Sequence, residues 1–175
     1  MLREDAPGGV YGRPEDWPRW AVLLPHVLAA TSHTGDGLDE GPALECSWLL
    51  DRAGTYLQTQ GRYREAVPLM QRALAIDERV HGPDHPEVAT SLNNLALVLQ
   101  ELGDPAGARP LAERALAIDE QAYGSDHPYV AILLNNVAAV LQELGERDTA
   151  AAYRARADAI RAAQNTTHSS GEADG

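Results

Sequence analysis

Apolar residues along this chain recur with the period of an α-helix. One stripe with the i, i+3, i+4, i+7 spacing consists of Val88, Leu92, Leu95, Ala96, Leu99 and Leu102. A second stripe consists of Leu111, Ala115 and Ile118. Between the two stripes lies Gly103-Asp104-Pro105, in which glycine suits the left-handed residue that ends a helix and proline suits the first turn of the next. The pattern therefore predicts an antiparallel helix pair over about 86–122.

The pattern repeats with a period of 42 residues. Gly61, Gly103 and Gly145 are 42 positions apart, and the string from Arg72 to Glu78 recurs unchanged from Arg114 to Glu120. A fixed period of this length is typical of stacked supersecondary units. We therefore expect three helix pairs in repeats at 43–85, 86–127 and 128–163.

The flanking segments differ in composition from the repeats. Residues 1–15 are rich in glycine, proline and charge, and we expect an irregular segment there. Within 16–42 the sequence predicts a helix that opens at Asp16-Trp17-Pro18 and ends near Ala30, followed by a linker rich in glycine and aspartate. The polar residues 164–175 predict a disordered tail.

Small residues recur where two helices would touch. Ala96, Ala108 and Ala115 have counterparts in the other units. Together with the leucines of the first stripe, this pattern resembles the tetratricopeptide repeat. The strings SLNNLALVLQELG, ALAID and GPDHPEVA at a 42-residue period resemble the subclass found in kinesin light chains and many bacterial proteins. The resemblance implies an all-α, right-handed solenoid with an extra N-terminal helix, which binds a peptide or a partner helix in its concave groove.

A second resemblance lies upstream. The string EDWPRWAVLLPHVLAAT, followed by CSWLLDRAGTYLQTQGRYREAVPLMQRALAI, is similar to the start of the repeat region in actinobacterial NB-ARC-type signalling ATPases. It implies the regulatory or sensor arm of such an ATPase. No nucleotide-binding motif is present in this sequence, so the chain would be that arm alone or a stand-alone relative.

Charge and composition exclude several classes of function. The 14 basic and 26 acidic residues give a net charge of −12, and the sequence contains no lysine. A basic stripe for nucleic-acid phosphates or an anionic membrane is therefore missing, as is the Gly-Lys pair of a phosphate-binding loop. No apolar run is long enough to span a bilayer and the N-terminus lacks a secretory signal, so we expect a cytoplasmic protein.

No catalytic or metal-binding constellation emerges. His85 and His127 recur at one loop position, which indicates loop geometry and capping rather than a metal site. The pairs Asp77-Glu78 and Asp119-Glu120 predict a solvated acidic face. The single cysteine, Cys46, excludes a disulfide within the chain and a cysteine-based zinc cluster. We expect no enzyme activity, no cofactor and no metal.

Counting from the buried stripe assigns the residues of the predicted groove. They are Trp48, Asp51, Arg52, Thr55, Thr90, Asn93, Leu97, Gln100, Glu101, Ile132, Asn135, Ala139, Gln142 and Glu143. Asparagine amides can pair with the main chain of an extended peptide, and in the resembling families the asparagines at the positions of Asn93 and Asn135 line the groove. They could equally bond neighbouring repeats and set their stacking, and the sequence leaves both interpretations open.

The charge of the predicted groove indicates its partner. Asp51, Glu101 and Glu143 make the inner face acidic, so we expect a protein or peptide with basic residues. Self-association is an alternative. Three repeats leave an open end beside Trp48, which either the helix with Trp17 and Trp20 or a second copy would cover.

Overall fold

The computed structural model describes residues 17–32 and 39–171, with side chains up to residue 164 except that of Ser32. This part of the chain contains seven helices and no strand. The helices are α2 (Trp17–Ser32), α3 (Glu40–Thr59), α4 (Tyr63–His81), α5 (Pro86–Glu101), α6 (Pro105–Tyr123), α7 (Pro128–Glu143) and α8 (Arg147–Gly171). The predicted all-α class is confirmed.

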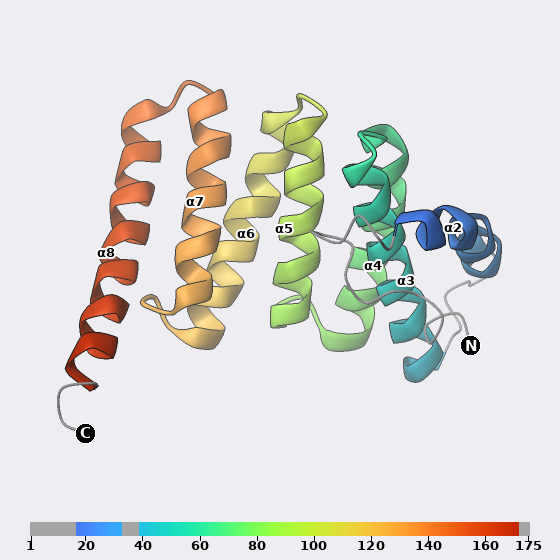
Figure 1. Cartoon of the computed structure of the whole chain (residues 1–175), viewed down its shortest axis with the longest axis horizontal. Coiled ribbons are helices and arrows are strands. Elements are labelled where there is room, and N and C mark those ends of the chain that lie inside the picture. Colours follow the sequence, from blue (N-terminus) through green and yellow to red (C-terminus); the bar gives the residue numbers. More distant parts are fainter. Residues whose placement is uncertain (1–16, 33–38, 172–175) are drawn as a thin grey trace.

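The helices form three antiparallel pairs that stand side by side, as Figure 1 shows. The pairs are α3 with α4, α5 with α6, and α7 with α8, and each second helix packs against the first helix of the following pair. The helix α2 packs on α3 at one end of the stack, where Trp20 is fully buried and its ring stacks on Tyr56 with centroids 6.4 Å apart. The chain is a repeat solenoid with one extra N-terminal helix.

The turns follow the sequence signals. Gly61, Gly103 and Gly145 take the left-handed conformation with φ values of 70°, 84° and 83°, which side chains rarely adopt. His85 caps α5 by accepting the amide of Glu87 through Nδ1 at 3.2 Å, and His127 caps α7 in the same way. The predicted capping role of these two histidines is confirmed.

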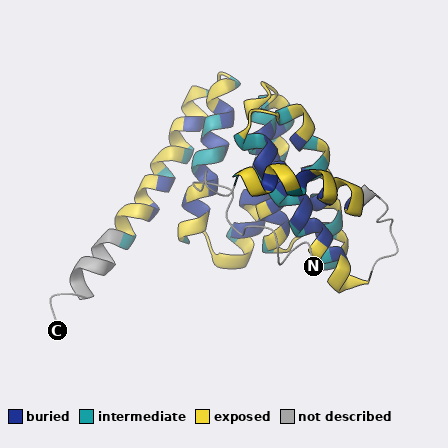
Figure 2. Ribbon diagram, turned by 45° about the vertical axis from the view of Figure 1, so that its right-hand side comes forward, coloured by how far each residue is buried: buried dark blue, intermediate teal, exposed yellow. Residues whose placement is uncertain are grey.

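The core lies along facing stripes of neighbouring helices, drawn in dark blue in Figure 2. Ala96, Ala108 and Ala115 are at most 2% exposed, and their counterparts in the other units are also buried. A side chain no larger than a methyl group lets the two helix axes approach closely. Two of the buried clusters extend over more than one helix pair, so the stacking of the repeats joins the pairs into one structure.

The predicted acidic face at Asp77-Glu78 and Asp119-Glu120 is wrong. Asp77 is 8% exposed and Asp119 is 9% exposed. Each aspartate lies four residues after a buried alanine, Ala73 or Ala115, so the helical period places it on the packed side.

The glutamates of these two sequence pairs form ion pairs with arginines of the next repeat. The Glu78 carboxylate pairs with Arg114 of the next repeat at 2.5 Å, and Glu120 pairs with Arg156 at the same distance. Each arginine also donates to a loop carbonyl of the preceding repeat, that of Pro83 or Ser125. The second helices of successive repeats are therefore joined by a recurring ion pair.

Two segment boundaries differ from expectation. α3 begins at Glu40. α8 continues as a helix to Gly171, through a polar stretch after Ala163 that contains no proline and no glycine before Gly171. The segment 1–15, part of the predicted linker and residues 172–175 lie outside the described residues. Within the described residues, none of the helices has both the length and the apolar character to cross a membrane.

Candidate binding groove

Two hollows open on the face carried by the first helices of the repeats. The upstream hollow lies among α3, α4 and α5 and has a volume of about 360 Å³. It is lined by Leu44, Ser47, Trp48, Asp51, Arg52, Asp77, His81, Glu87, Thr90 and Ser91.

The downstream hollow lies among α5, α6 and α7 and measures about 190 Å³. Its lining residues are Pro86, Ala89, Thr90, Asn93, Asp119, Tyr123, Tyr129, Ile132 and Leu133. Each of them stands 42 positions after a residue of the upstream hollow, so the two are the same site in successive repeats. Thr90 lines both hollows, which therefore adjoin and form one groove.

The upstream hollow is dominated by charge. Asp51, Asp77 and Glu87 line it together with Arg52. The Arg52 guanidinium pairs with Asp51 at 3.4 Å and lies 5.9 Å from the centre of the Trp48 ring. Burial raises the pKa of the Asp51 carboxyl, and the hydrogen bond from Asn94 and the charge of Arg52 oppose this shift. With three carboxylates against one arginine, the hollow favours cationic groups.

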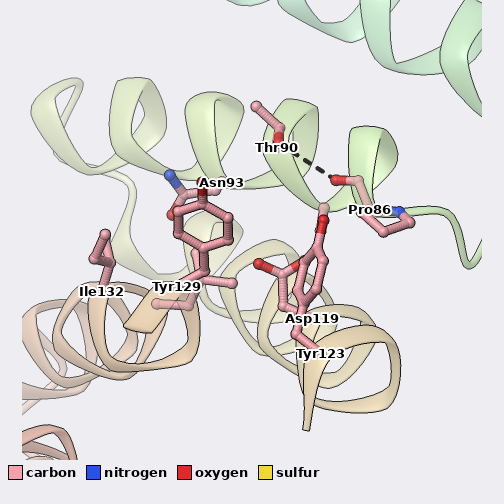
Figure 3. A pocket seen from close by; sticks show the side chains of 9 residues that line it. Pro86, Thr90, Asn93, Asp119, Tyr123, Tyr129 and Ile132 are labelled. Carbon is pink, nitrogen blue, oxygen red and sulfur yellow. Dashed lines mark hydrogen bonds between the residues drawn. The ribbon is translucent and has the colours of Figure 1, made fainter. Parts of the chain in front are cut away.

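The downstream hollow is mainly aromatic and apolar. The rings of Tyr123 and Tyr129 meet edge to face with centroids 5.7 Å apart, and Tyr123 also stacks on His127. Ile132 is 52% exposed at the rim, where Figure 3 shows it on the same side as Tyr129. Exposed aromatic and apolar side chains at one site are typical of interaction surfaces.

Six of the residues expected in the groove line one of the hollows. They are Trp48, Asp51, Arg52, Thr90, Asn93 and Ile132. Thr55 is only 1% exposed, so it is not available to a partner in this structure. The reason is local, since every residue from Ala53 to Leu57 is buried and α3 presents no open face there.

Two of these lining residues also form hydrogen bonds to the next repeat. The Asn93 Oδ1 atom accepts from Asn136 Nδ2 at 2.8 Å, and one repeat earlier Asp51 accepts from Asn94 in the same way at 2.9 Å. Asn135, which has no following repeat among the described residues, donates to the Ala131 carbonyl of its own helix at 2.7 Å. These contacts give Asn93 a stacking role that the sequence left open.

The remaining expected residues lie beyond both hollows. Leu97 and Ala139 are half-buried, and Gln100 donates to Glu143 of the next repeat at 2.5 Å. Glu101 is exposed and accepts from the Tyr63 hydroxyl at 3.3 Å, which raises the pKa of Tyr63 through the glutamate charge. Gln142 is exposed and accepts from the Arg154 guanidinium.

Sequence reasoning missed the second-helix residues of the site. These are Asp77 and His81 in the upstream hollow, and Asp119 and Tyr123 in the downstream hollow. A signal was present, because each aspartate continues a stripe of buried alanines. An ionisable residue on a buried stripe is unusual enough to mark a specific contact or a site.

The described residues show no group of three or more histidine, cysteine, aspartate or glutamate side chains that could hold a metal ion.

A family model described as tetratricopeptide repeat matches residues 44–121 and again residues 87–163. The chain belongs to the tetratricopeptide repeat family. Tetratricopeptide repeats generally mediate protein–protein interaction, and their fold is typically a scaffold without enzymatic activity.

Solved structures share this tetratricopeptide fold. A kinesin light chain of Podosopora anserina with nearly identical repeats is 21% identical, with a TM-score of 0.70 over 86% of this chain and 71% of that chain. BtubC from P. vanneervenii is 24% identical, with a TM-score of 0.73 over 86% of this chain and 60% of BtubC. The tetratricopeptide domain of Arabidopsis FLU is 19% identical, with a TM-score of 0.58 over 73% of this chain and 99% of that domain. At these identities the likeness shows the fold alone.

Proposed function

We propose that this protein binds a polypeptide with basic residues along the groove formed by the two hollows. The observation that carries the proposal is the recurrence of one hollow in two successive repeats, joined at Thr90. A site repeated along a solenoid suits an elongated ligand, which meets equivalent positions as it passes from one repeat to the next.

Charge supports a basic partner. The groove is lined by Asp51, Asp77 and Glu87 upstream and by Asp119 downstream, within a chain of net charge −12. Complementary charge mainly increases the rate of encounter and the selectivity for a partner. Trp48, Tyr129 and Ile132 supply the apolar contact area that a stable complex also needs.

The test is a fluorescence anisotropy titration of the full chain against labelled peptide pools of basic, neutral and acidic composition. We expect the basic pool to bind most tightly and its affinity to fall as salt is raised. Equal binding of all pools, independent of salt, would contradict the charge argument. Binding of none of them would contradict the proposed function itself.

Two variants locate the binding. Glu87→Gln removes an exposed groove charge while keeping the shape of the side chain, and it should weaken binding of the basic pool. Asp158→Asn removes one negative charge from α8, outside both hollows, where the side chain is 73% exposed, and it should leave binding unchanged. Equal losses in the two variants would indicate a general charge effect without a groove.

Two other functions remain predictions. The regulatory arm of an NB-ARC-type ATPase, indicated by the stretch from Trp17 to Thr31, would be tested by whether the gene encodes a nucleotide-binding domain upstream. Self-association would be tested by light scattering across protein concentration. The burial of Trp20 against α3 shows that α2 covers part of the open end of the stack.

A further inference from the structure

The two hollows differ in how they hold their buried aspartate. In the upstream hollow the Asp77 carboxylate accepts from the Ser47 hydroxyl at 2.5 Å and from the Ser91 hydroxyl at 2.6 Å. One serine belongs to the same helix pair and the other to the next repeat, so Asp77 is held from both sides.

In the downstream hollow the corresponding aspartate has lost these partners. The positions 42 residues after Ser47 and Ser91 are occupied by Ala89 and Leu133, whose side chains cannot donate a hydrogen bond. No donor among the described residues bonds the Asp119 carboxylate, and no arginine or histidine pairs with it within salt-bridge distance. Asp119 is nevertheless only 9% exposed.

The side chain points into the hollow. Figure 3 shows the Asp119 carboxylate directed toward the space bordered by Tyr123, Tyr129 and Asn93. Burial raises the pKa of Asp119, although the charge of the neighbouring His127 opposes this shift. A largely buried carboxylate that accepts no hydrogen bond from the described residues is unfavourable, and the charge of His127 offsets only part of this cost.

The residues that line the downstream hollow are suited to a cationic group. Tyrosine faces attract cations, and a guanidinium or ammonium group would supply the hydrogen bonds that Asp119 lacks. The hollow is smaller than the roughly 300–1,000 Å³ of typical ligand pockets, which suits a single side chain. Asp119 is its one carboxylate among the lining residues, so a divalent metal would find too few ligands.

We infer that the downstream hollow is a receptor for one arginine or lysine side chain of the bound polypeptide, with Asp119 as its counter-ion and the two tyrosines as its walls. This inference rests on the proposed function and names the position at which the groove selects its partner. The upstream hollow occupies the same position in its repeat but is not included in this inference, because its aspartate already accepts hydrogen bonds from Ser47 and Ser91.

The test is an NMR titration of the full chain with N-acetyl-arginine methylamide and N-acetyl-lysine methylamide, with the uncharged citrulline analogue as control. We expect the ring signals of Tyr123 and Tyr129 to shift with at least one cationic ligand and not with citrulline. The preferred cation identifies the side chain.

Three variants test whether binding of the cationic ligand depends on the Asp119 carboxylate. Asp119→Asn keeps the shape of the side chain and should weaken the cationic ligand roughly tenfold or more. Ala89→Ser restores the donor that Asp77 receives from Ser47 and should also lower the affinity, because it competes for the same carboxylate. Asp158→Asn, far along α8, should leave the titration unchanged. A thermal melt of each variant establishes that it is folded.

The outcomes separate the inference from the proposed function. If neither cationic ligand produces a shift that depends on Asp119, the inference is overturned, even if basic peptides still bind along the groove. If the ligands bind at Asp119 but no peptide pool binds, the hollow is a cation site and the proposed function fails. Equal shifts with citrulline would also overturn the inference.

Discussion

The most informative residues are two aspartates that occupy the same position in successive repeats. Both lie on a buried helix face, but Asp77 accepts two hydroxyl hydrogen bonds, whereas Asp119 accepts none from the part of the chain that the structure describes. Because a buried charge depends on its partners for compensation, the same residue type has opposite energetic effects at the two positions. The difference comes from two neighbours, Ala89 and Leu133, which replace serines.

This contrast predicts that replacing aspartate by asparagine has opposite effects on stability at the two positions. Asp77→Asn weakens two hydrogen bonds to a charged acceptor and should lower the free energy of unfolding by about 1–3 kcal/mol. Asp119→Asn removes a charge that only His127 partly compensates, and after allowance for solvent screening it should raise the free energy of unfolding by up to about 1 kcal/mol. Urea unfolding of the two variants beside the parent chain measures both effects, and a large loss from Asp119→Asn would show that this carboxylate has a structural partner.

The advantage of Asp119→Asn should depend on pH. The folded-state pKa of Asp119 lies above the ordinary 3.8, so the folded chain binds the proton more tightly than the unfolded chain. The parent chain therefore loses stability as pH rises from about 3.8 through the raised pKa, and the advantage of the variant appears over that interval.

Other titrating groups near Asp119 do not account for this pH dependence of the stability difference. His127 lies in the loop before α7, Tyr123 and Tyr129 border the hollow, and Glu87 lies nearby on α5. All of them are present in both chains, as is Asp51 with its own raised pKa, so their independent contributions cancel in the difference. A difference that does not change with pH would contradict the assignment to Asp119.

Each helix pair is held by contacts matched to the sizes of the side chains at its crossing. In α3 and α4 the contact is formed by Gly54 and Met70, and a Cβ atom added at Gly54 would lie 2.7 Å from the Met70 Cγ atom. In the next pair the same two positions hold Ala96 and Ala112, both buried. The repeats therefore use two solutions to one packing problem, one glycine with methionine and the other two alanines.

A double-mutant cycle tests this matching. Gly54→Ala alone should destabilise by up to about 2 kcal/mol, since overpacking exceeds the gain in helix propensity. In the Met70→Ala background the same change should stabilise, because it recreates the alanine pair of the next repeat. We expect a coupling energy of about 1 kcal/mol or more from chemical unfolding of the four chains. Additive effects would show that the two side chains do not compete for space.

The whole molecule is built by contacts that repeat from one unit to the next. On one face Asp51 with Asn94 and Asn93 with Asn136 link the first helices, and on the other face arginine–glutamate pairs link the second helices. Stability in such a stack is close to a sum over units and their interfaces. The groove forms where two units meet, so a residue there can serve both stacking and binding.

Replacing Asn93 and replacing Asn135 should therefore have different effects on stability. Asn93→Ala leaves the Asn136 amide unpaired and should lower the free energy of unfolding by about 1 kcal/mol. Asn135→Ala removes only a bond to its own helix and replaces a poor helix former, so the melting temperature should stay nearly unchanged. Thermal melts compare stability, and the basic peptide pool compares binding. Equal losses of stability would contradict the stacking role assigned to Asn93 alone.

Much of the architecture could be predicted from the sequence because it depends on local periodicity. The 3.6-residue apolar stripes, the glycine and proline signals and the 42-residue period identify the helices, their ends and their pairing, since these features act within one repeat. The capping by His85 and His127 belongs to the same class, because the bonded amide lies two residues away along the chain.

The groove could be predicted only in part. First-helix positions such as Trp48 and Thr90 follow from the helical period, but Thr55 is enclosed by its surroundings and Asp119 enters the site from a second helix. Which of two equivalent aspartates is satisfied depends on side chains that approach from two different helices, such as Ser47 and Ser91 around Asp77. The sequence by itself determined the helices and their order, and only the tertiary structure decided which polar groups are paired, because pairing depends on distances between units that no local pattern encodes.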